Sequence, residues 1–455
     1  RGVVGIGKTF IDSIQIGIPI RKKEFNHIAL SFDKDAVDNA DRLLLKYRND
    51  TLDAKERRTY RVIDSVGKEV NLDKKLAFFD ALSTGFLRLG YVQLDLNRLI
   101  NYNRYEGYRL GLGLTTSNRF SNWLTLGAYA AYGFKDKALK YGGLVEAQLS
   151  RDYQAKLGYR YTHDVVESGT TRFYNDKLSQ EERYRTLFVS QMDRLQQHEL
   201  YFTFRTGYIQ PTLFANVQNR NVANLYQAID GTSIFNYAQA GISIRYAFRE
   251  TFIQQPNRLL SLGTKYPVVF VQAVHSWDKT SPSYNRIDAK IQQSFLLRNL
   301  GRLNMNVSGG WIDQTAIPLT LLFNGRANGY TGFSIAGRNN FETMGMNEFV
   351  ASSYAQCFIA HDFGKLLFKT KNFAPELVLT YNVLFGDKLN GTIGTLKTAE
   401  KGYQETGLIV NNLVKMNAQF FNQGFGIGAF YRLGNYSFAT PKDNIALKLT
   451  YIISF

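Results

Sequence analysis

The sequence predicts an all-β fold, a transmembrane antiparallel β-barrel of about sixteen strands, on three observations. First, alternating segments of roughly ten residues follow one another from about Tyr91 onward, separated by polar or glycine-bearing turns. Second, no window of about 18 uninterrupted apolar residues exists, which excludes a transmembrane helix but not a barrel, because barrel strands alternate. Third, the chain stops on an alternating segment, Ile445–Phe455.

The composition suits a sheet protein. Phe and Tyr number 33 and 28 among 455 residues, and 20% of residues are charged. The net charge of +17 is compatible with nucleic-acid binding, but the basic residues are spread along many predicted strands and form no cluster. We therefore expect no nucleic-acid partner and place the basic residues in the lumen and loops, some of them facing anionic lipid head groups. The single Cys357 excludes an internal disulfide.

Residues 1–90 differ from the rest of the chain. They are rich in charge, and Asp35–Arg48 and Asp53–Asp64 look helical, while Leu76–Leu89 looks amphipathic. So many charged side chains are too costly to place in lipid. The sequence therefore predicts a small periplasmic or plug segment ahead of a barrel that occupies residues 91–455.

The alternation also assigns a face to each residue. In the segments that begin at Tyr153, Ala238 and Leu303, the apolar set is expected toward lipid and the polar set toward a hydrated lumen. Soluble β-sandwiches alternate too, but the unbroken succession of strands and the aromatic residues at strand ends favour a membrane barrel. The predicted basic lumen residues are Lys156, Arg160, Arg245, Lys290 and Lys448.

Long connections interrupt the series, and one strand is expected to begin near Asn347. Barrels of this class have short periplasmic turns and long outer loops, so most of the long connections should be extracellular, with residues 249–265 as a possible exception. Glu181–Glu182 and Arg183–Arg185 are interpreted as part of a solvated outer loop. The predicted long connections are 166–198, 249–265, 314–346 and 387–402.

Nothing in the sequence predicts catalysis. His163–Asp164 and His361–Asp362 invite comparison with outer-membrane proteases that use Asp and His, but adjacent strand residues point to opposite faces and make a poor dyad. Metal-ligand spacing, phosphate-binding glycine loops and cysteine pairs are absent from the sequence. We therefore expect no enzyme, no catalytic residue, no bound metal and no cofactor.

The final segment resembles the assembly signal of bacterial outer-membrane β-barrels, because it alternates and ends on an aromatic residue with another aromatic four positions earlier. This resemblance implies the bacterial outer membrane as the location. It also implies outer-membrane lipid, lipopolysaccharide and, during biogenesis, the barrel assembly machinery as partners. The residues of this signal are Tyr451, Ile453 and Phe455.

The connection Asp313–Asn347 resembles the sixth extracellular loop of the assembly and secretion barrel superfamily that includes BamA, TamA and the two-partner secretion transporters. In that superfamily the loop folds back into the lumen, and its Arg is held by an acidic residue of the barrel wall. Here two asparagines stand between Arg338 and Phe341, so the motif is not intact, and Glu348 and Glu376 are the candidate partners. The predicted loop-lock residues are Gly337, Arg338, Phe341 and Glu348.

A second resemblance covers nearly the whole chain. Four segments are similar to those of a Bacteroidota outer-membrane family of unknown function, whose members usually carry a carboxypeptidase-regulatory-like domain ahead of the barrel. No such domain fits into residues 1–90, and the family has no settled activity to carry over. The segments are Asn103–Gly111, Ala131–Lys137, Phe341–Val350 and Gly402–Leu408.

Two functions remain open from the sequence. In the first, the barrel aids the insertion, export or display of envelope proteins, with protein partners in the outer membrane or periplasm, a lumen-folded loop around Arg338, and an openable seam between the first strand and residues 443–455. In the second, the chain is a gated pore whose basic lumen selects anionic solutes.

Overall fold

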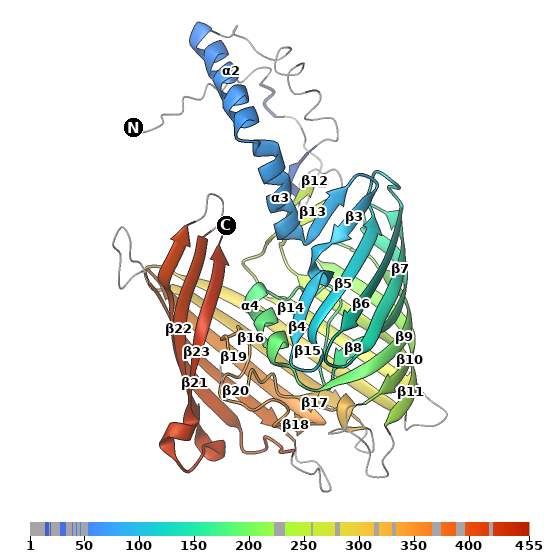
Figure 1. The fold of residues 1–455 in the computed structure, drawn as a ribbon, viewed down its shortest axis with the longest axis vertical. Helices are drawn as coiled ribbons and strands as arrows, with labels where there is room; N and C mark the ends of the chain where they lie inside the picture. The colour runs from blue at the N-terminus through green and yellow to red at the C-terminus, as the bar shows by residue number, and fades with distance from the viewer. Residues whose placement is uncertain are drawn as a thin grey trace. The chain divides into compact units, whose positions relative to one another are not determined.

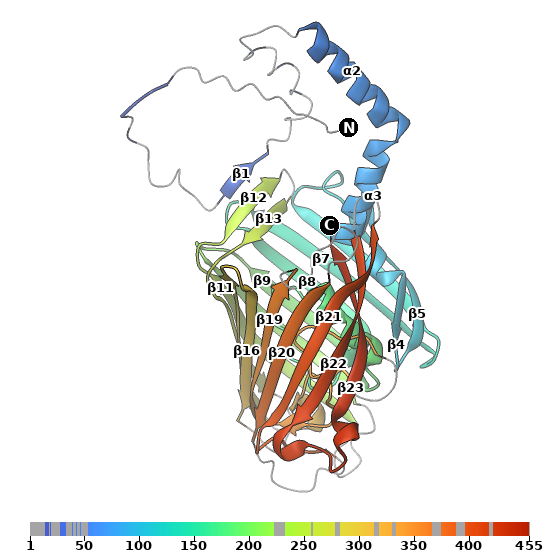
Figure 2. The same cartoon turned by 90° about the vertical axis from the view of Figure 1, so that its left-hand side faces the viewer.

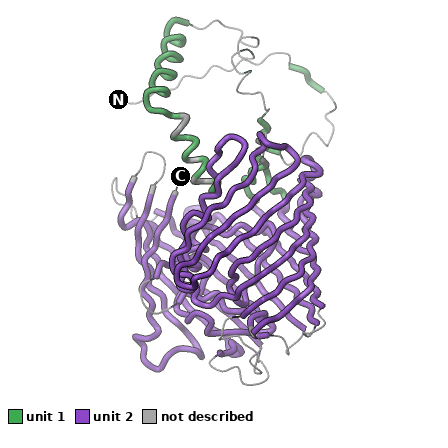
Figure 3. The backbone as a smooth tube through the Cα atoms, turned by 45° about the vertical axis from the view of Figure 1, so that its right-hand side comes forward, with its two compact units in different colours: residues 1–85, 249–264 green, residues 86–248, 265–455 purple. Residues whose placement is uncertain are grey.

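The computed structural model divides into two compact units, residues 1–85 with 249–264, and residues 86–248 with 265–455 (Figure 3). Each unit is described by itself. The residues that the structure describes are 14–17, 19, 28–32, 39, 42, 46, 53–222, 233–255, 258–277, 283–313, 318–329, 334–365, 375–387, 396–417 and 422–454.

In the described residues, the longer helices of the smaller unit are α2 (Ala54–Glu69) and α3 (Leu72–Thr84). Helix α2 begins at a capping box, in which the Asp53 carboxylate accepts the Glu56 N–H at 2.6 Å and the Glu56 carboxylate accepts the Asp53 N–H at 3.0 Å. Helix α3 ends at Gly85, whose φ of 77° is typical of a left-handed helix cap. The predicted helix at 53–64 is confirmed, whereas the one at 35–48 lies largely outside the described residues.

The amphipathic segment 76–89 is split in the structure, because α3 ends and a short strand then begins at Phe86. In the part of the chain that the structure describes, no helix is long and apolar enough to cross a membrane. The smaller unit also holds a three-stranded sheet, in which β1 (Ile28–Ser31) runs parallel to β12 (Thr251–Gln255), and β12 pairs antiparallel with β13 (Arg258–Gly263).

The larger unit is a barrel-forming antiparallel sheet of eighteen strands, which confirms the predicted fold class (Figures 1 and 2). In chain order the strands are β2 (Phe86–Leu89), β3 (Val92–Asp95), β4 (Ile100–Asn103), β5 (Gly107–Thr116), β6 (Leu124–Gly133), β7 (Ala138–Ser150), β8 (Ala155–Glu167), β9 (Met192–Thr203), β10 (Ile209–Asn221), β11 (Ile234–Ala247), β14 (Val268–Trp277), β15 (Tyr284–Leu297), β16 (Gly301–Ile312), β19 (Ser353–Gly364), β20 (Glu376–Gly386), β21 (Tyr403–Asn417), β22 (Asn422–Leu433) and β23 (Ile445–Ser454).

The strand count differs from the predicted sixteen for a local reason. Strands β3 and β4 lie along the same neighbour, since Val92 pairs with Thr116 and Ile100 with Leu110, both on β5. The short 3₁₀ helix η2 (Leu96–Arg98) interrupts them, so together they occupy the place of one broken strand. The short β2 adds a further strand beside β3.

The predicted faces agree with the observed exposure. On β8, Leu157 and Tyr159 are exposed on the outside, while Arg160 and Thr162 line an internal cavity. On β16, Val307 and Trp311 are exposed on the outside, and the intervening Asn306 and Ser308 are buried. On β11, Ser243 is buried and Gln239 lines the same cavity as Arg160. The alternation therefore separates an apolar outer surface from a polar interior.

The long connections are distributed unequally between the two ends of the barrel. Because neighbouring strands are antiparallel, successive connections alternate between the ends. The connections 168–191, 313–352 and 387–402 therefore share one end, while 248–267, which contains β12 and β13, leaves from the other end, where β23 also finishes. The connection 249–265, which was predicted as a possible exception, thus joins strand ends on the opposite side of the barrel from the other long connections. Which end is extracellular stays a prediction.

Much of the packed core lies inside the barrel. The inner elements are helix α4 (Gln180–Arg183), the 3₁₀ helices η3 (Tyr184–Phe188) and η5 (Leu319–Leu321), and the two-residue strands β17 (Phe323–Asn324) and β18 (Val350–Ala351). Outside them, η6 (Gly434–Tyr436) and η7 (Pro441–Asn444) join β22 to β23. One apolar cluster packs connection residues against the wall; its largest members are Phe341, Met344, Phe349, Phe358 and Tyr403.

Candidate functional site: two inner segments and the edge of β23

Two connections fold into the barrel, and we call them the first inner segment (168–191) and the second inner segment (313–352). The first segment turns at Ser179, whose hydroxyl accepts the Glu182 N–H at 3.3 Å while the Glu182 carboxylate accepts the Ser179 N–H at 2.8 Å. The second segment turns at Asn339, which adopts a left-handed backbone conformation with φ of 56°. The Asn339 side chain donates to Glu182 at 2.9 Å, so the two turns contact each other.

A buried arginine holds the first inner segment to the wall. Arg185 is 6% exposed and donates from both terminal nitrogens to Glu167 at the end of β8, and its Nε donates to the Ala327 carbonyl at 2.8 Å. This corrects the interpretation of 181–185 as a solvated outer loop, because Glu182 and Arg185 are buried, Glu181 and Tyr184 are partly buried, and only Arg183 is exposed. The clamp expected of Arg338 is thus made by Arg185.

Glu405 on β21 receives the backbone of the second inner segment. Its fully buried carboxylate accepts the N–H groups of Glu342 and Thr343 at 2.9 and 2.8 Å, and the Thr343 hydroxyl at 2.7 Å. Asn382 on β20 donates to the same carboxylate at 2.8 Å. A charged acceptor with several donors makes strong bonds in a low-dielectric interior, so Glu405 fixes the position of Glu342 and Thr343.

Glu342 then contacts the last strand. Its carboxylate lies 2.7 Å from Lys448 Nζ on β23, and both side chains are 1% exposed. The Lys448 ammonium also donates to the Gly329 carbonyl at 2.7 Å, and Glu342 accepts the Gly337 N–H at 2.9 Å. Burial and the neighbouring Glu405 raise the pKa of Glu342 even though Lys448 and the Gly337 N–H favour its charged form.

A second carboxylate of the inner segment reaches β22. Glu348 accepts from the nearly buried Arg432 at 2.7 Å and lies 3.1 Å from Lys397 Nζ. Burial alone would raise the pKa of Glu348, but Arg432, the Gly345 N–H and Lys397 together hold it below its ordinary value. Glu348 was expected as a partner of Arg338, but the structure pairs it with Arg432 on the wall and with Lys397.

Arg338 is placed elsewhere. Its described ion pair is with Glu181 of the first inner segment, at 2.8 Å, and the two side chains are 48% and 28% exposed. The wall acid expected to hold it does not do so in the described residues: Glu348 faces Arg432, and Glu376 lies 3.8 Å from Lys365. The charges of these pairs are therefore the reverse of those predicted. The second inner segment supplies the carboxylates Glu342 and Glu348, and the wall supplies the cations Lys448 and Arg432.

The outer edge of β23 is the most unusual part of this region. In the described residues the only ladder of β23 is with β22, from Tyr431↔Ile445 to Asn422↔Ser454. On the opposite edge, the Leu449 N–H donates to the Ser334 carbonyl at 3.2 Å and the Leu449 carbonyl accepts the Ala336 N–H at 2.8 Å. Ile335 therefore forms a parallel bridge with Leu449. We call Ser334–Ala336 the edge cap.

The other predicted basic lumen residues lie in the interior but are mostly paired. Lys156 lies 2.7 Å from Glu146, Arg160 3.0 Å from Glu199, and Lys290 2.7 Å from Asp176. Arg245 lies over the Phe270 ring, with 5.9 Å between the guanidinium carbon and the ring centroid. Lys448 belongs to the Glu342 pair. Local carboxylates therefore offset much of the positive charge.

The His–Asp pairs do not form dyads. Asp164 points inward, where it accepts two bonds from Arg109 at 2.7 and 2.9 Å and one from the Tyr129 hydroxyl at 2.9 Å. His163 is stacked on the Tyr141 ring, on the other face of β8. His361 lies 2.8 Å from the Leu300 carbonyl in the neighbouring turn. Among the described residues, no group of three or more His, Cys, Asp or Glu side chains is arranged to hold a metal ion.

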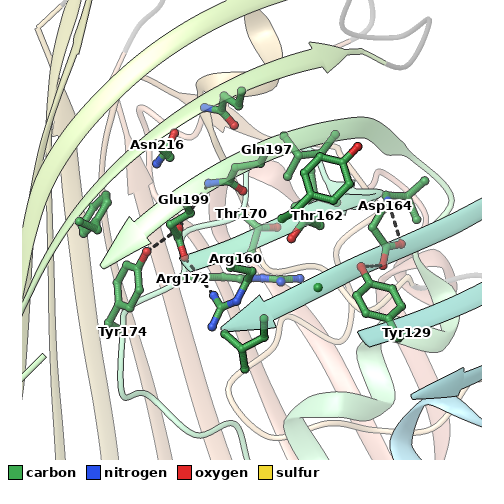
Figure 4. Close-up of a pocket in the computed structure, with 18 of the residues that line it drawn as sticks. Tyr129, Arg160, Thr162, Asp164, Thr170, Arg172, Tyr174, Gln197, Glu199 and Asn216 are labelled. Atoms are coloured by element: carbon green, nitrogen blue, oxygen red, sulfur yellow. Dashed lines mark hydrogen bonds and ion pairs between the residues drawn. The ribbon is translucent and has the colours of Figure 1, made fainter. Parts of the chain in front are cut away.

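Two cavities remain between the inner segments and the wall. The larger, of about 810 Å³, is lined by Thr170–Tyr174 and by strands of the wall from β5 to β15 (Figure 4). The smaller, of about 500 Å³, is also lined by Thr170–Phe173, together with Lys290, Asn306 and Ser308 of β15 and β16. In Figure 4, Tyr174 and Arg160 both reach Glu199, and Tyr129 reaches Asp164.

Sequence reasoning missed Glu405, Glu342, Arg432 and Arg185, although a signal for two of them was present. The segments 341–350 and 402–408 stood out by resemblance, and the structure brings them together, since Thr343 contacts Glu405 and Phe341 packs edge-on against Tyr403. Two conspicuous segments that are far apart in a barrel sequence are thus in direct contact. For Arg185 and Arg432 the sequence carried no comparable signal.

The chain is similar to one family model and to several solved structures. Residues 212–407 match the model of the C-terminal domain of a family of unknown function, DUF5686. No curated protein matches the chain. Similar solved structures include BamA from Haemophilus ducreyi lacking POTRA domains 1–3 (9% identity, 78% of this chain and 69% of that chain, TM-score 0.48) and CdiB from Escherichia coli (9%, 77% and 60%, 0.41). A third is OccK11 from Pseudomonas aeruginosa (10%, 77% and 92%, 0.29).

Proposed function

We propose that this chain is an outer-membrane barrel of the assembly or translocation type, which aids insertion, export or surface display of envelope proteins by opening at the edge of β23. The proposal rests on the incomplete backbone pairing of the outer edge of β23. In the described residues, strand β23 pairs with β22 on one side and is bridged on the other only by the three-residue edge cap. A strand edge with unpaired N–H and C=O groups is a template for another strand.

The described contacts of this edge leave a defined set of backbone groups without a partner. Because Leu449 directs both its N–H and its C=O to the outer edge, so do Leu447 and Tyr451, two residues away in each direction. These side chains alternate with Lys448 and Thr450, which are buried toward the interior. An incoming apolar-alternating strand would therefore continue both the ladder and the two faces of the wall.

The pore alternative has weaker support. Its selectivity would come from the basic lumen residues, but the described contacts pair Lys156, Arg160, Lys290 and Lys448 with carboxylates. The two inner segments also occupy the interior that a solute would have to cross.

A disulfide across the edge cap tests the proposal. The variant Ile335→Cys/Leu449→Cys, in a Cys357→Ser background, joins the bridged residues of the cap and β23. In cells that depend on this variant, oxidation is expected to lower the levels of other outer-membrane and surface proteins, and reduction is expected to restore them. The measurement is quantitative proteomics of the isolated outer membrane.

The matched control shares one cysteine. Ile427→Cys/Leu449→Cys links β23 to β22, which are neighbours in the wall, and leaves the outer edge free. This variant should support normal protein levels whether oxidised or reduced. If the edge-cap disulfide leaves envelope protein levels unchanged, or if the control is equally damaging, opening at this edge is not the function.

A further inference from the structure

The larger internal cavity has a chemistry that the proposed assembly function does not use. Its wall carries the carboxamide side chains Gln197, Asn216, Gln218, Gln239 and Gln272 from four neighbouring strands. Their positions follow from the ladders, in which Gln197 pairs with Gln218 and Asn216 with Gln239. The volume of about 810 Å³ lies within the range of small-molecule sites, about 300–1,000 Å³.

Two of these side chains carry acceptors without a protein donor. Asn216 and Gln272 are 7% and 9% exposed, and their carbonyl oxygens Oδ1 and Oε1 have no hydrogen-bond partner in the part of the chain that the structure describes. Buried polar atoms are normally paired, because an unpaired one costs about 1–3 kcal/mol. Both oxygens are covered, so a guest in the cavity meets the remaining polar atoms of this carboxamide wall, which can exchange hydrogen bonds with hydroxyl groups.

The same space contains an uncompensated cation. Among the lining residues, Arg160 is paired with Glu199, and Asp164 with Arg109. Arg172 lines both cavities and is exposed to them, and the described residues include no ion-pair partner for it. Figure 4 shows Arg172 beside Arg160, on the side of the cavity formed by the first inner segment. A guanidinium in this setting favours an anionic group.

We propose that this cavity binds a small hydroxylated anion of the acidic-sugar class, with its hydroxyl groups hydrogen-bonded to the carboxamide wall and a carboxylate accepting from Arg172. The neutral carboxamides make the site selective by hydrogen bonding, and the single uncompensated charge sets the sign of the ligand. This site is independent of the edge of β23, so each proposal can fail without the other.

Isothermal titration of the whole chain in detergent micelles tests the site with three probes. Trigalacturonate has hydroxyl and carboxylate groups, maltotriose has hydroxyl groups only, and tricarballylate has carboxylate groups only. We expect trigalacturonate to bind more tightly than both others by about tenfold or more, because it alone satisfies both halves of the site. Equal binding of maltotriose overturns the role of charge, equal binding of tricarballylate overturns the role of the hydroxyl groups, and no binding of trigalacturonate overturns the site.

Variants identify the residues. Arg172→Gln should weaken trigalacturonate binding about tenfold or more, with Arg172→Lys restoring part of the loss, and Asn216→Leu should weaken it severalfold. Arg151→Gln, which removes the same charge from a turn outside the cavity, should leave the affinity unchanged. Far-ultraviolet circular dichroism verifies that each variant is folded. Undiminished binding in folded Arg172→Gln and Asn216→Leu, or an equal loss in Arg151→Gln, would place the ligand elsewhere and refute the assignment.

Discussion

Glu405 and Lys448 illustrate how single side chains organise the interior of this barrel. Each is buried on a wall strand, and each meets the short run Glu342–Thr343: Glu405 accepts its backbone N–H groups, and Lys448 neutralises its carboxylate. A buried charge is tolerated only when it is paired and hydrogen-bonded. The position of the second inner segment therefore depends on these two wall residues more than on its conspicuous Arg338.

Lys448→Met should destabilise the protein strongly. The substitution leaves Glu342 buried without its cation, and breaking a buried pair costs about 3–5 kcal/mol. The expected result is a lower midpoint of chemical unfolding in detergent, followed by circular dichroism, together with faster hydrogen exchange of the segment around Thr343. Adding Glu342→Gln to the variant should recover part of the loss, because it removes the orphaned charge.

Arg338→Gln is the matched control, since it also removes one positive charge from an ion pair, in this case the pair between the two inner segments. Its partner Glu181 is part-exposed, and such pairs contribute about 0–1 kcal/mol. Its unfolding midpoint should remain close to that of the unaltered protein. A loss as large as that of Lys448→Met would mean that Arg338 is the lock after all.

At the level of elements, the strands were predictable, and the inward course of the second inner segment was expected only from the resemblance of 313–347 to a lumen loop. The first inner segment was not expected. Alternation is a local property, so the faces of β8, β11 and β16 could be assigned from the sequence. The strand expected near Asn347 begins instead at Ser353. Phe349 is buried in the internal apolar cluster and Val350 belongs to the short strand β18, so neither lies on the outer surface of the barrel. An apolar run inside a barrel and an apolar run on its surface look the same in sequence.

The ion-pair partners of residues in the inner segments could not be predicted either, because they depend on how each segment folds. Glu348 was predicted as a partner of Arg338, which lies earlier in the same segment. In the structure it contacts Arg432 on β22, because the path of the folded segment decides which cation it meets. Arg185 looked like an ordinary loop cation because its partner Glu167 lies across a turn of the first inner segment. Long-range pairing in a lumen carries no periodic signal.

Gly169→Ala tests how closely the two inner segments are joined. Gly169 has a φ of 70°, its N–H donates to Thr320, and a Cβ there would lie 2.6 Å from the Leu322 carbonyl oxygen. The variant combines a left-handed alanine with a steric clash, so we expect a loss of stability well above about 1 kcal/mol. Faster hydrogen exchange at 319–324, measured by mass spectrometry, should accompany it.

Gly207→Ala separates the two effects. Gly207 also has a positive φ, 55°, but a Cβ there would meet nothing within 4 Å. Only the backbone cost of about 1 kcal/mol should remain, with no change in exchange at 319–324. Equal effects of the two substitutions would show that the segments are not tightly packed at Gly169.

At the scale of the whole molecule, the two inner segments should hinder the passage of ions through the barrel. They are anchored to the wall through Arg185, Glu342 and Glu348, and Thr170–Phe173 line both cavities. A wall of this size without such contents would enclose water. Low ionic current is therefore expected of the intact protein.

Planar-bilayer recording measures this directly. Replacing residues 319–349 with a short Gly-Ser linker should raise the single-channel conductance severalfold, because it removes the anchored material from the lumen. Replacing residues 251–263, which belong to the smaller unit, should not. A large current through the intact protein, or an unchanged current after the first replacement, would favour the pore interpretation.

The parallel pairing of β1 with β12 places a condition on the order in which the chain matures. Residues 28–31 cannot find their partner until residues 251–255 exist, and between these two stretches the chain encodes the first ten strands of the wall. Contacts so distant in sequence form late, since closing a long loop is entropically costly. The β1–β12 ladder of the smaller unit can therefore form only after the first ten strands of the wall have been synthesised. Formation of this ladder thus marks that stage of synthesis.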